Sequence, residues 1–133
     1  MGIEKIKLRR PETHQKGWGR ELWLANGEKY CGKLLEFNEG SKFSMHYHMV
    51  KEETFYVLKG KLTLIMFDLA TAEEERRELA VGDVVDIPAG NPHQIVAKEH
   101  SIIIEISTEH FEDDSYRVRK GDSQKNGKAD TDN

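Results

Sequence analysis

The sequence of 133 residues is long enough for one domain with a single core and too short for two. Its formal net charge of -4 and isoelectric point near 5.9 argue against nucleic-acid binding, which needs a basic surface. The single cysteine, Cys31, excludes a disulfide framework and a thiolate cluster for zinc.

The amino terminus is charged and polar. Residues 1–16 contain Pro11, which discourages helix, and we expect them to form an arm that lies against the domain or a partner subunit. This segment lacks the apolar centre of a signal peptide, and no apolar run approaches the ~20 residues that span a bilayer. The sequence therefore predicts a cytoplasmic protein with no membrane association.

Two strands follow the arm. Residues 21–25 and 30–37 are predicted to pair, because Asn26-Gly27 between them is a strong hairpin signal. Cys31 is interpreted as a small buried hydrophobe. Lys33 interrupts the apolar pattern of its strand, so it either pairs with a carboxylate or meets an anionic substrate. Trp18, between two glycines, either plugs the end of a barrel or gates its mouth, and we favour the plug.

Residues 40–60 hold the first candidate site. His46 and His48 are two residues apart on a predicted strand, 42–48, so both imidazoles face the same side, as two ligands of one metal ion do. A carboxylate, Glu52 or Glu53, then opens a returning strand that ends before Gly60. The return brings that carboxylate beside the imidazoles.

The chain continues through a strand at 61–67 to a charged segment at 73–79. This segment contains good helix formers but is too short for a stable helix, and we predict an exposed edge strand. Residues 82–93 then combine a short apolar strand, a Pro/Gly turn and His93, which opens a strand at 93–97. His93 is therefore a third candidate ligand.

Three imidazoles and one carboxylate leave coordination positions open, as catalytic sites do. These ligand types suit manganese, iron, cobalt, nickel or zinc and do not choose among them. The three remaining histidines, His14, His100 and His110, have no partner at ligand spacing and are interpreted as loop residues.

Residues 101–108 form the longest β-branched run, and Glu105 interrupts it. If Ile102, Ile104 and Ile106 face outward, Glu105 lines the interior with Ile103 and Ser107. A carboxylate in such a strand is costly unless it is paired or functional. Glu105 is thus either a general acid/base or the partner of Lys33 or an arginine in a structural ion pair.

Many short strands separated by turns, with no convincing helix, indicate an all-β barrel or sandwich. We place this domain at residues 17–118. Residues 119–133 contain almost no apolar side chains and are predicted to be a disordered polar tail.

The two histidine stretches resemble the paired motifs of the cupin superfamily. The first motif runs from Gly40 to Gly60, and its spacing selects Glu53 over Glu52, which becomes a surface charge; the second runs from Gly82 to His93. The chain departs from the family pattern at Ala97, where asparagine is common. The resemblance implies a double-stranded β-helix, or jelly roll, that holds one divalent transition metal ion on His46, His48, Glu53 and His93.

Within the cupins, residues 17–118 are similar to the carboxy-terminal domain of type II mannose-6-phosphate isomerases. The shared features include Trp18-Gly19, the strand ending at 105–107 and an acidic segment leading to Arg117. The resemblance implies a catalytic role for Arg117, whose alternative is a surface ion pair with Asp113 or Asp114. Small cupins commonly exchange amino-terminal strands, so it also implies a homodimer.

We therefore expect a metal-dependent isomerase of a small sugar or sugar phosphate. The metal would stabilise an enediolate, Glu105 or a metal-bound water would move the proton, and Arg117 and Lys33 would hold an anionic end. The same ligands also suit a non-haem iron dioxygenase, which takes substrate and oxygen at its open positions. A third possibility is a non-catalytic metal- and sugar-binding sensor.

Overall fold

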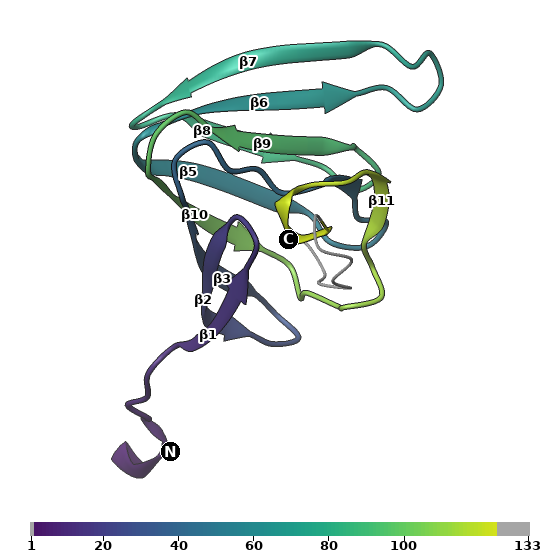
Figure 1. Ribbon diagram of the computed structural model, residues 1–133. Helices are drawn as coiled ribbons and strands as arrows, with labels where there is room; N and C mark the ends of the chain where they lie inside the picture. The colour runs from purple at the N-terminus through teal and green to yellow at the C-terminus, as the bar shows by residue number, and fades with distance from the viewer. Residues whose placement is uncertain (1, 125–133) are drawn as a thin grey trace.

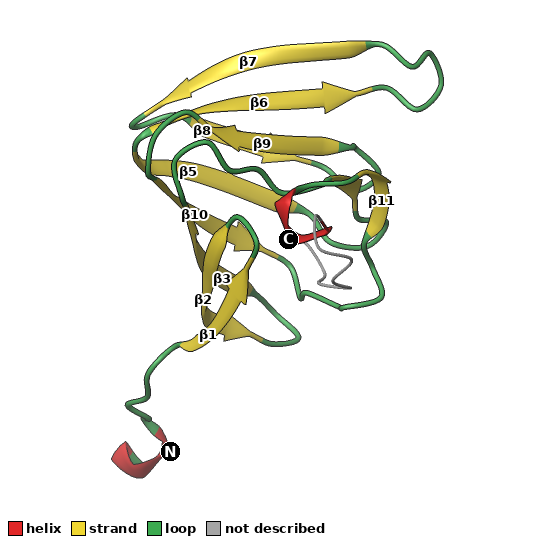
Figure 2. Cartoon of the chain, in the orientation of Figure 1, coloured by secondary structure: helices red, strands yellow, loops and turns green. Residues whose placement is uncertain are grey.

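The computed structural model describes residues 2–124, and two β-sheets dominate this range (Figures 1 and 2). The elements in chain order are η1 (Ile3–Lys5), β1 (Glu12–Lys16), β2 (Gly19–Asn26), β3 (Cys31–Phe37), β4 (Met45–Tyr47), β5 (Glu53–Lys59), β6 (Lys61–Phe67), β7 (Glu74–Ala80), β8 (Val84–Ile87), β9 (His93–Ala97), β10 (Ser101–Ser107), β11 (Tyr116–Arg119) and η2 (Asp122–Gln124).

The strands alternate between the sheets as a jelly roll requires. One sheet has the order β1-β2-β3-β10-β5-β8 and the other the order β11-β4-β9-β6-β7, with antiparallel pairing between neighbours. This arrangement confirms the predicted all-β jelly roll. The charged segment predicted as an edge strand is β7, which pairs with β6 along its full length at the margin of the second sheet.

The core lies between the sheets and follows the period of two along each strand. In β3 the buried positions are Cys31, Lys33, Leu35 and Phe37, and the residues between them are only partly buried. Trp18 is fully buried and stacks on Phe37 at 4.6 Å between ring centroids, so it plugs the core and does not gate a mouth. Burial of each apolar side chain of this core, such as Leu35 or Phe37, stabilises the fold by about 1.5–3 kcal/mol.

Two glycines of the histidine stretches adopt backbone conformations that other residues rarely reach. Gly60 has a φ of 95° in the turn from β5 to β6, and a β-carbon there would collide with the side chain of Ser101. Gly90 has a φ of 84° in the turn before β9, and its N–H donates to the carbonyl oxygen of His48 at 2.6 Å. The turn of the second motif is thereby tied to the first motif.

The two ends of the chain differ from expectation. Residues 12–16 of the predicted arm form β1, which pairs with β2 and extends the first sheet. At the other end, β11 pairs with β4, and Ser123 and Gln124 of η2 are buried. Ser123 Oγ accepts a hydrogen bond from the Gly17 N–H at 3.1 Å, so residues 119–124 belong to the fold. The rest of the predicted tail, 125–133, lies outside the described residues.

The remaining part of the arm runs away from the sheets (Figure 1). Its apolar side chains Ile3, Ile6 and Leu8 are 87%, 80% and 102% exposed. Within residues 2–124, no helix has the length and apolar character needed to cross a membrane.

Candidate metal centre

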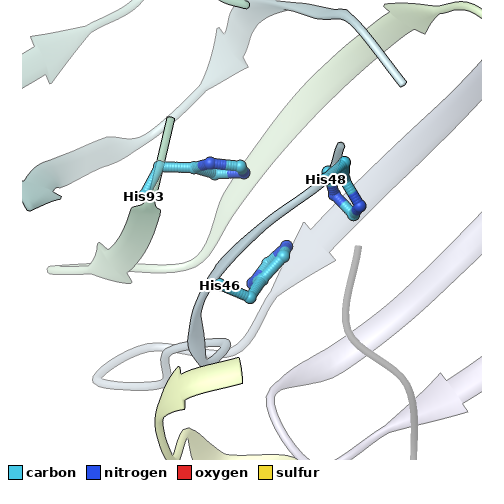
Figure 3. A group of neighbouring side chains, drawn as sticks. All are labelled: His46, His48 and His93. Atoms are coloured by element: carbon cyan, nitrogen blue, oxygen red, sulfur yellow. The ribbon is translucent and has the colours of Figure 1, made fainter. Parts of the chain in front are cut away.

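Three histidines from two neighbouring strands converge between the sheets (Figure 3). His46 lies in β4 and pairs in register with His93, the first residue of β9, while His48 follows the end of β4. All three side chains are buried, and their candidate ligand nitrogens lie within 4.8 Å of one another. The period-two spacing of His46 and His48 therefore has the predicted consequence that both imidazoles point inward.

Each imidazole is oriented by a hydrogen bond from its Nδ1 to a backbone carbonyl oxygen. The acceptors are Ser44 for His46 at 2.8 Å, Asp114 for His48 at 2.7 Å and Asn91 for His93 at 2.9 Å. A carbonyl oxygen only accepts, so each neutral ring carries its proton on Nδ1 and presents the lone pair of Nε2. Such outer contacts are typical of metal-binding histidines.

Glu53, the first residue of β5, faces the same point. Its Oε1 lies 3.6 Å from His48 Nε2, and its Oε2 lies 3.1 Å from His93 Nε2. Two atoms bound to one ion at about 2.1 Å are separated by roughly 3.0–3.4 Å, so the 3.1 Å spacing fits a shared divalent metal and the 3.6 Å spacing is slightly longer. Within residues 2–124, no hydrogen bond satisfies Nε2 of His48 or of His93, as expected of atoms reserved for another ligand.

The electrostatics keep these groups in the protonation states that bind metal. Burial holds the pKa of His46 well below its usual value, with further lowering by His93 and His48, and burial also lowers the pKa of His48. Burial alone would raise the pKa of Glu53, but Lys51 and the neighbouring imidazoles hold it well below its usual value. Neutral imidazoles beside a carboxylate are the forms that ligate a cation. The arrangement is consistent with a metal site whose identity is open.

A buried lysine supports the carboxylate. Lys51 Nζ lies 2.9 Å from Glu53 Oε1 and 3.3 Å from Glu105 Oε2, and all three side chains are at most 1% exposed. Glu105 Oε2 also accepts a hydrogen bond from Ser107 Oγ at 2.8 Å. Glu105 thus lines the interior with Ile103 and Ser107, as the alternation of β10 predicts, and it forms an ion pair with Lys51.

Lys33 lies opposite Glu105 in the register of β3 and β10, and it is fully buried. Its Nζ is 3.5 Å from Glu21 Oε1 and 4.3 Å from the centre of the Trp23 ring. Trp23 Nε1 donates to the same Glu21 oxygen at 2.7 Å. Lys33 is therefore enclosed by a carboxylate and an aromatic face.

Arg117 lies in β11 opposite His46 in the strand register, but its side chain is exposed. Glu52 is exposed, which agrees with its interpretation as a surface charge. His14 stacks on Trp23 and His100 bonds Glu36 near the surface. These residues do not join the histidine cluster.

Three residues near the centre were not anticipated. Lys51 carries a signal that could have identified it, because it stands two residues before Glu53 and shares its face. The carboxylate of Asp114 accepts from the N–H groups of Met49, Val50 and Lys51 at 2.9–3.2 Å. His110, expected to be a loop residue without a partner, is buried and its Nδ1 accepts from Lys51 Nζ at 3.1 Å.

A cavity of about 610 Å³ lies beside the centre, and His93 is the one cluster residue among its described lining residues. It lies between the β6–β7 hairpin and the segment from β8 to the start of β9, and His93 forms part of its wall. Its apolar lining residues are Leu64, Met66, Phe67, Leu69, Ala70, Val85, Ile87, Pro88 and Pro92. Its acidic lining residues are Asp68, Glu73, Glu74, Glu75 and Asp86. A small ligand in this cavity would meet both kinds of side chain and the His93 wall.

Known proteins resemble the chain in sequence and in structure. Over 100 residues it is 35% identical to quercetin 2,3-dioxygenase of Bacillus subtilis, covering 70% of this chain and 28% of that protein. Over 103 residues it is 26% identical to mannose-1-phosphate guanylyltransferase of Sinorhizobium fredii, covering 76% of this chain and 19% of that protein. The capsular polysaccharide assembling protein CapF of Staphylococcus aureus superposes with a TM-score of 0.76 at 20% identity, over 84% of this chain and 33% of CapF.

The chain thus spans a third or less of the length of each of these proteins. The model of the cupin domain matches residues 33–108, which include all three histidines and Glu53. With the jelly-roll topology and the buried three-histidine cluster, this match shows that the chain belongs to the cupin family.

Proposed function

We propose that the chain is a metal-dependent dioxygenase that acts on a small hydroxylated substrate. The observation that carries the proposal is the buried set of three imidazoles and Glu53 beside the wall of the 610 Å³ cavity. The similarity to quercetin 2,3-dioxygenase, 35% identical over 100 residues, supports the same reaction class. A bound metal would supply open positions for a hydroxyl group and for oxygen.

The chain's own residues would orient the reactants. The Nδ1 hydrogen bonds of His46, His48 and His93 fix the ring planes, so the ligand atoms are preorganised before substrate enters. Glu53 is the carboxylate nearest the imidazole nitrogens and can accept the proton of a substrate hydroxyl. The apolar cavity residues would contact the apolar part of a bound substrate.

The isomerase is the second candidate. The similarity to mannose-1-phosphate guanylyltransferase favours a carbohydrate ligand, and the metal set suits enediolate chemistry. Its expected base, Glu105, is held by Lys51 and Ser107 and is absent from the described residues that line the cavity. Lys33 and Arg117, expected to hold an anionic end, do not line it either among residues 2–124. These positions count against Glu105, Lys33 and Arg117 as residues that contact a ligand in this cavity.

One pair of assays tests both candidates. Protein loaded without air with Mn²⁺, Fe²⁺, Co²⁺ or Ni²⁺ is mixed with quercetin and smaller polyphenols, and oxygen uptake is recorded with ¹⁸O₂. Incorporation of both labelled atoms into product, lost in His93→Ala, supports the dioxygenase.

The same preparations are incubated in deuterium oxide with mannose 6-phosphate, fructose 6-phosphate and the free sugars. Deuterium at C2 with no oxygen uptake would replace the dioxygenase by the isomerase. Ligand binding with neither reaction would favour the sensor.

A further inference from the structure

The cavity beside the metal centre has an unbalanced charge. Five carboxylates line it, from Asp68, Glu73, Glu74, Glu75 and Asp86, and no lysine or arginine does so among residues 2–124. All the formally charged side chains that a ligand in this cavity would contact among the described residues are therefore negative.

Two of the five carboxylates are paired from outside the cavity. Glu74 bonds Arg119 at 2.6 Å and lies 3.4 Å from Arg76, and Glu75 lies 3.3 Å from Arg77. These guanidinium groups are 48–67% exposed, so their pairs are screened by solvent. They reduce the negative potential at the rim.

The other three carboxylates have no cationic partner within the described part of the chain. Asp68 accepts from the backbone N–H groups of Ala70 and Thr71, and Asp86 accepts from the hydroxyl of Thr54. Neutral donors leave the full negative charge in place, and Glu73 adds another beside Asp68. All three side chains are exposed, so solvent screens them as well, and the net charge of the described lining residues is negative.

The cavity also borders the centre. His93 forms part of its wall, is 1% exposed, and keeps an Nε2 atom without a hydrogen bond inside residues 2–124. A divalent ion would attract the anionic donor atoms at the metal-binding end of a ligand. The cavity carboxylates would then act on the charge of the ligand's other, distal end, which stays in the cavity.

We propose that this cavity rejects ligands whose distal part is anionic and selects uncharged or cationic ones with an apolar body. The inference rests on the proposed function only in placing a metal-binding ligand in this cavity. It names a substrate class that excludes phosphorylated sugars: a phosphate group would meet three unpaired carboxylates there and no cation among the described lining residues.

The test uses three probes with the same chelating pair of oxygens and different distal charges: catechol, dopamine and 3,4-dihydroxybenzoate. Binding to Co²⁺-loaded protein is followed without air through the visible absorption of the metal, at low salt. The probes differ in intrinsic chelation strength, so the compared quantity is the change in each affinity between wild type and variant.

The informative variant combines Asp68→Asn, Glu73→Gln and Asp86→Asn. The control combines Glu28→Gln, Glu39→Gln and Glu99→Gln, three exposed carboxylates outside this cavity that produce the same change of net charge. The cavity variant should tighten 3,4-dihydroxybenzoate relative to catechol on the order of tenfold and weaken dopamine by a similar factor. The control variant should change neither ratio.

Salt provides a measurement that needs no variant. Raising the ionic strength from about 0.01 M to 0.5 M shortens the screening length several-fold, so dopamine should weaken and 3,4-dihydroxybenzoate should tighten on wild-type protein. Unchanged ratios in the cavity variant and in salt, or equal shifts in the control, overturn the proposal. The readout requires no turnover, so a protein inactive with oxygen can still confirm it. If none of the three probes perturbs the cobalt spectrum, the cavity does not deliver ligands to the metal and this inference fails, whereas the dioxygenase proposal is still decided by the ¹⁸O₂ assay.

Discussion

Lys51 and Glu53 form an ion pair at 2.9 Å inside the barrel, with both side chains about 1% exposed. Burial alone would lower the pKa of Lys51, but Glu105 and Glu53 raise it above its usual value, so the ammonium stays charged. One buried cation therefore serves two buried carboxylates. The pair explains how Glu53, the candidate carboxylate ligand, remains ionised in the metal-free protein.

Lys51→Met should destabilise the metal-free protein by about 3–5 kcal/mol, because it leaves Glu53 and Glu105 buried without their cation. Denaturant unfolding with and without metal measures this. A bound metal should recover part of the loss, so the stabilisation by metal should be larger in the variant than in wild type. Lys98→Met, which removes an exposed pair with Glu78, should cost less than about 1 kcal/mol. Equal losses in the two variants would contradict the role of Lys51.

Asp114→Ala should lower metal affinity by roughly 10- to 100-fold, the usual cost of losing an outer-sphere contact. Its carboxylate organises the loop from Met49 to Lys51, and its backbone carbonyl orients His48. Competition with a chromophoric chelator measures the affinity. Asp113→Ala, at an exposed neighbouring position, is the control and should leave the affinity unchanged. Equal metal affinities of the Asp114→Ala and Asp113→Ala variants would mean that His48 is oriented without the Asp114 carboxylate.

His110 makes stability depend on pH. Burial, and then the charges of Lys51 and Lys33, lower its pKa to about 2, so the folded protein keeps it neutral. In the unfolded chain it takes a proton near pH 6.5, so below that pH the unfolded state binds more protons and stability falls as pH decreases. The contribution is about 1.4 kcal/mol per pH unit between roughly pH 5.5 and pH 3.

His110→Gln retains an acceptor for Lys51 and should reduce the proton uptake on unfolding by about one proton at pH 4.5. Urea titrations of the metal-free protein from pH 7 to pH 4.5 give this number. The assignment fails if His110→Gln unfolds with the wild-type pH dependence.

We propose that the exposed apolar arm mediates the homodimer that the cupin resemblance implies. Ile3, Ile6 and Leu8 are almost fully exposed in the single chain, and a partner subunit would remove them from water. Deletion of residues 2–11 should convert the dimer to a monomer in sedimentation velocity experiments. The triple change Ile3→Ser, Ile6→Ser and Leu8→Ser should do the same while keeping the arm's length. A wild-type protein that is monomeric at high micromolar concentration would exclude the dimer.

Periodicity explains how much could be predicted. The period of two along a strand fixes the face of each side chain, and this rule applies to His46, His48 and Glu53, which lie on or beside strands. His93 follows a Pro/Gly turn and is the first residue of β9. The same rule placed Glu105 inside the barrel. Its partner could not be chosen from sequence, because Lys51 is 54 positions away and reaches it only through the fold.

Loops have no periodicity from which the direction of a side chain could be predicted. Asp114 and His110 lie in the connection between β10 and β11, and they reach the centre through contacts 59–66 positions apart in sequence. The strand β1 was missed because the segment at 12–16 has no apolar alternation; it is ordered by pairing with β2. The buried pair of Lys33 and Glu21 required the register of β2 and β3.

Metal content after reconstitution tests the central claim most directly. Wild-type protein is dialysed with Mn²⁺, Fe²⁺, Co²⁺, Ni²⁺ or Zn²⁺, freed of excess ion, and analysed by mass spectrometry of the metal beside His46→Ala, His93→Ala and the surface control His100→Ala. We predict one equivalent of at least one of these metals in wild type and in His100→Ala. We also predict a loss of affinity beyond about 100-fold in the other two variants, since each loses a direct ligand. Full occupancy in both His46→Ala and His93→Ala, or no metal in wild type, would contradict the site.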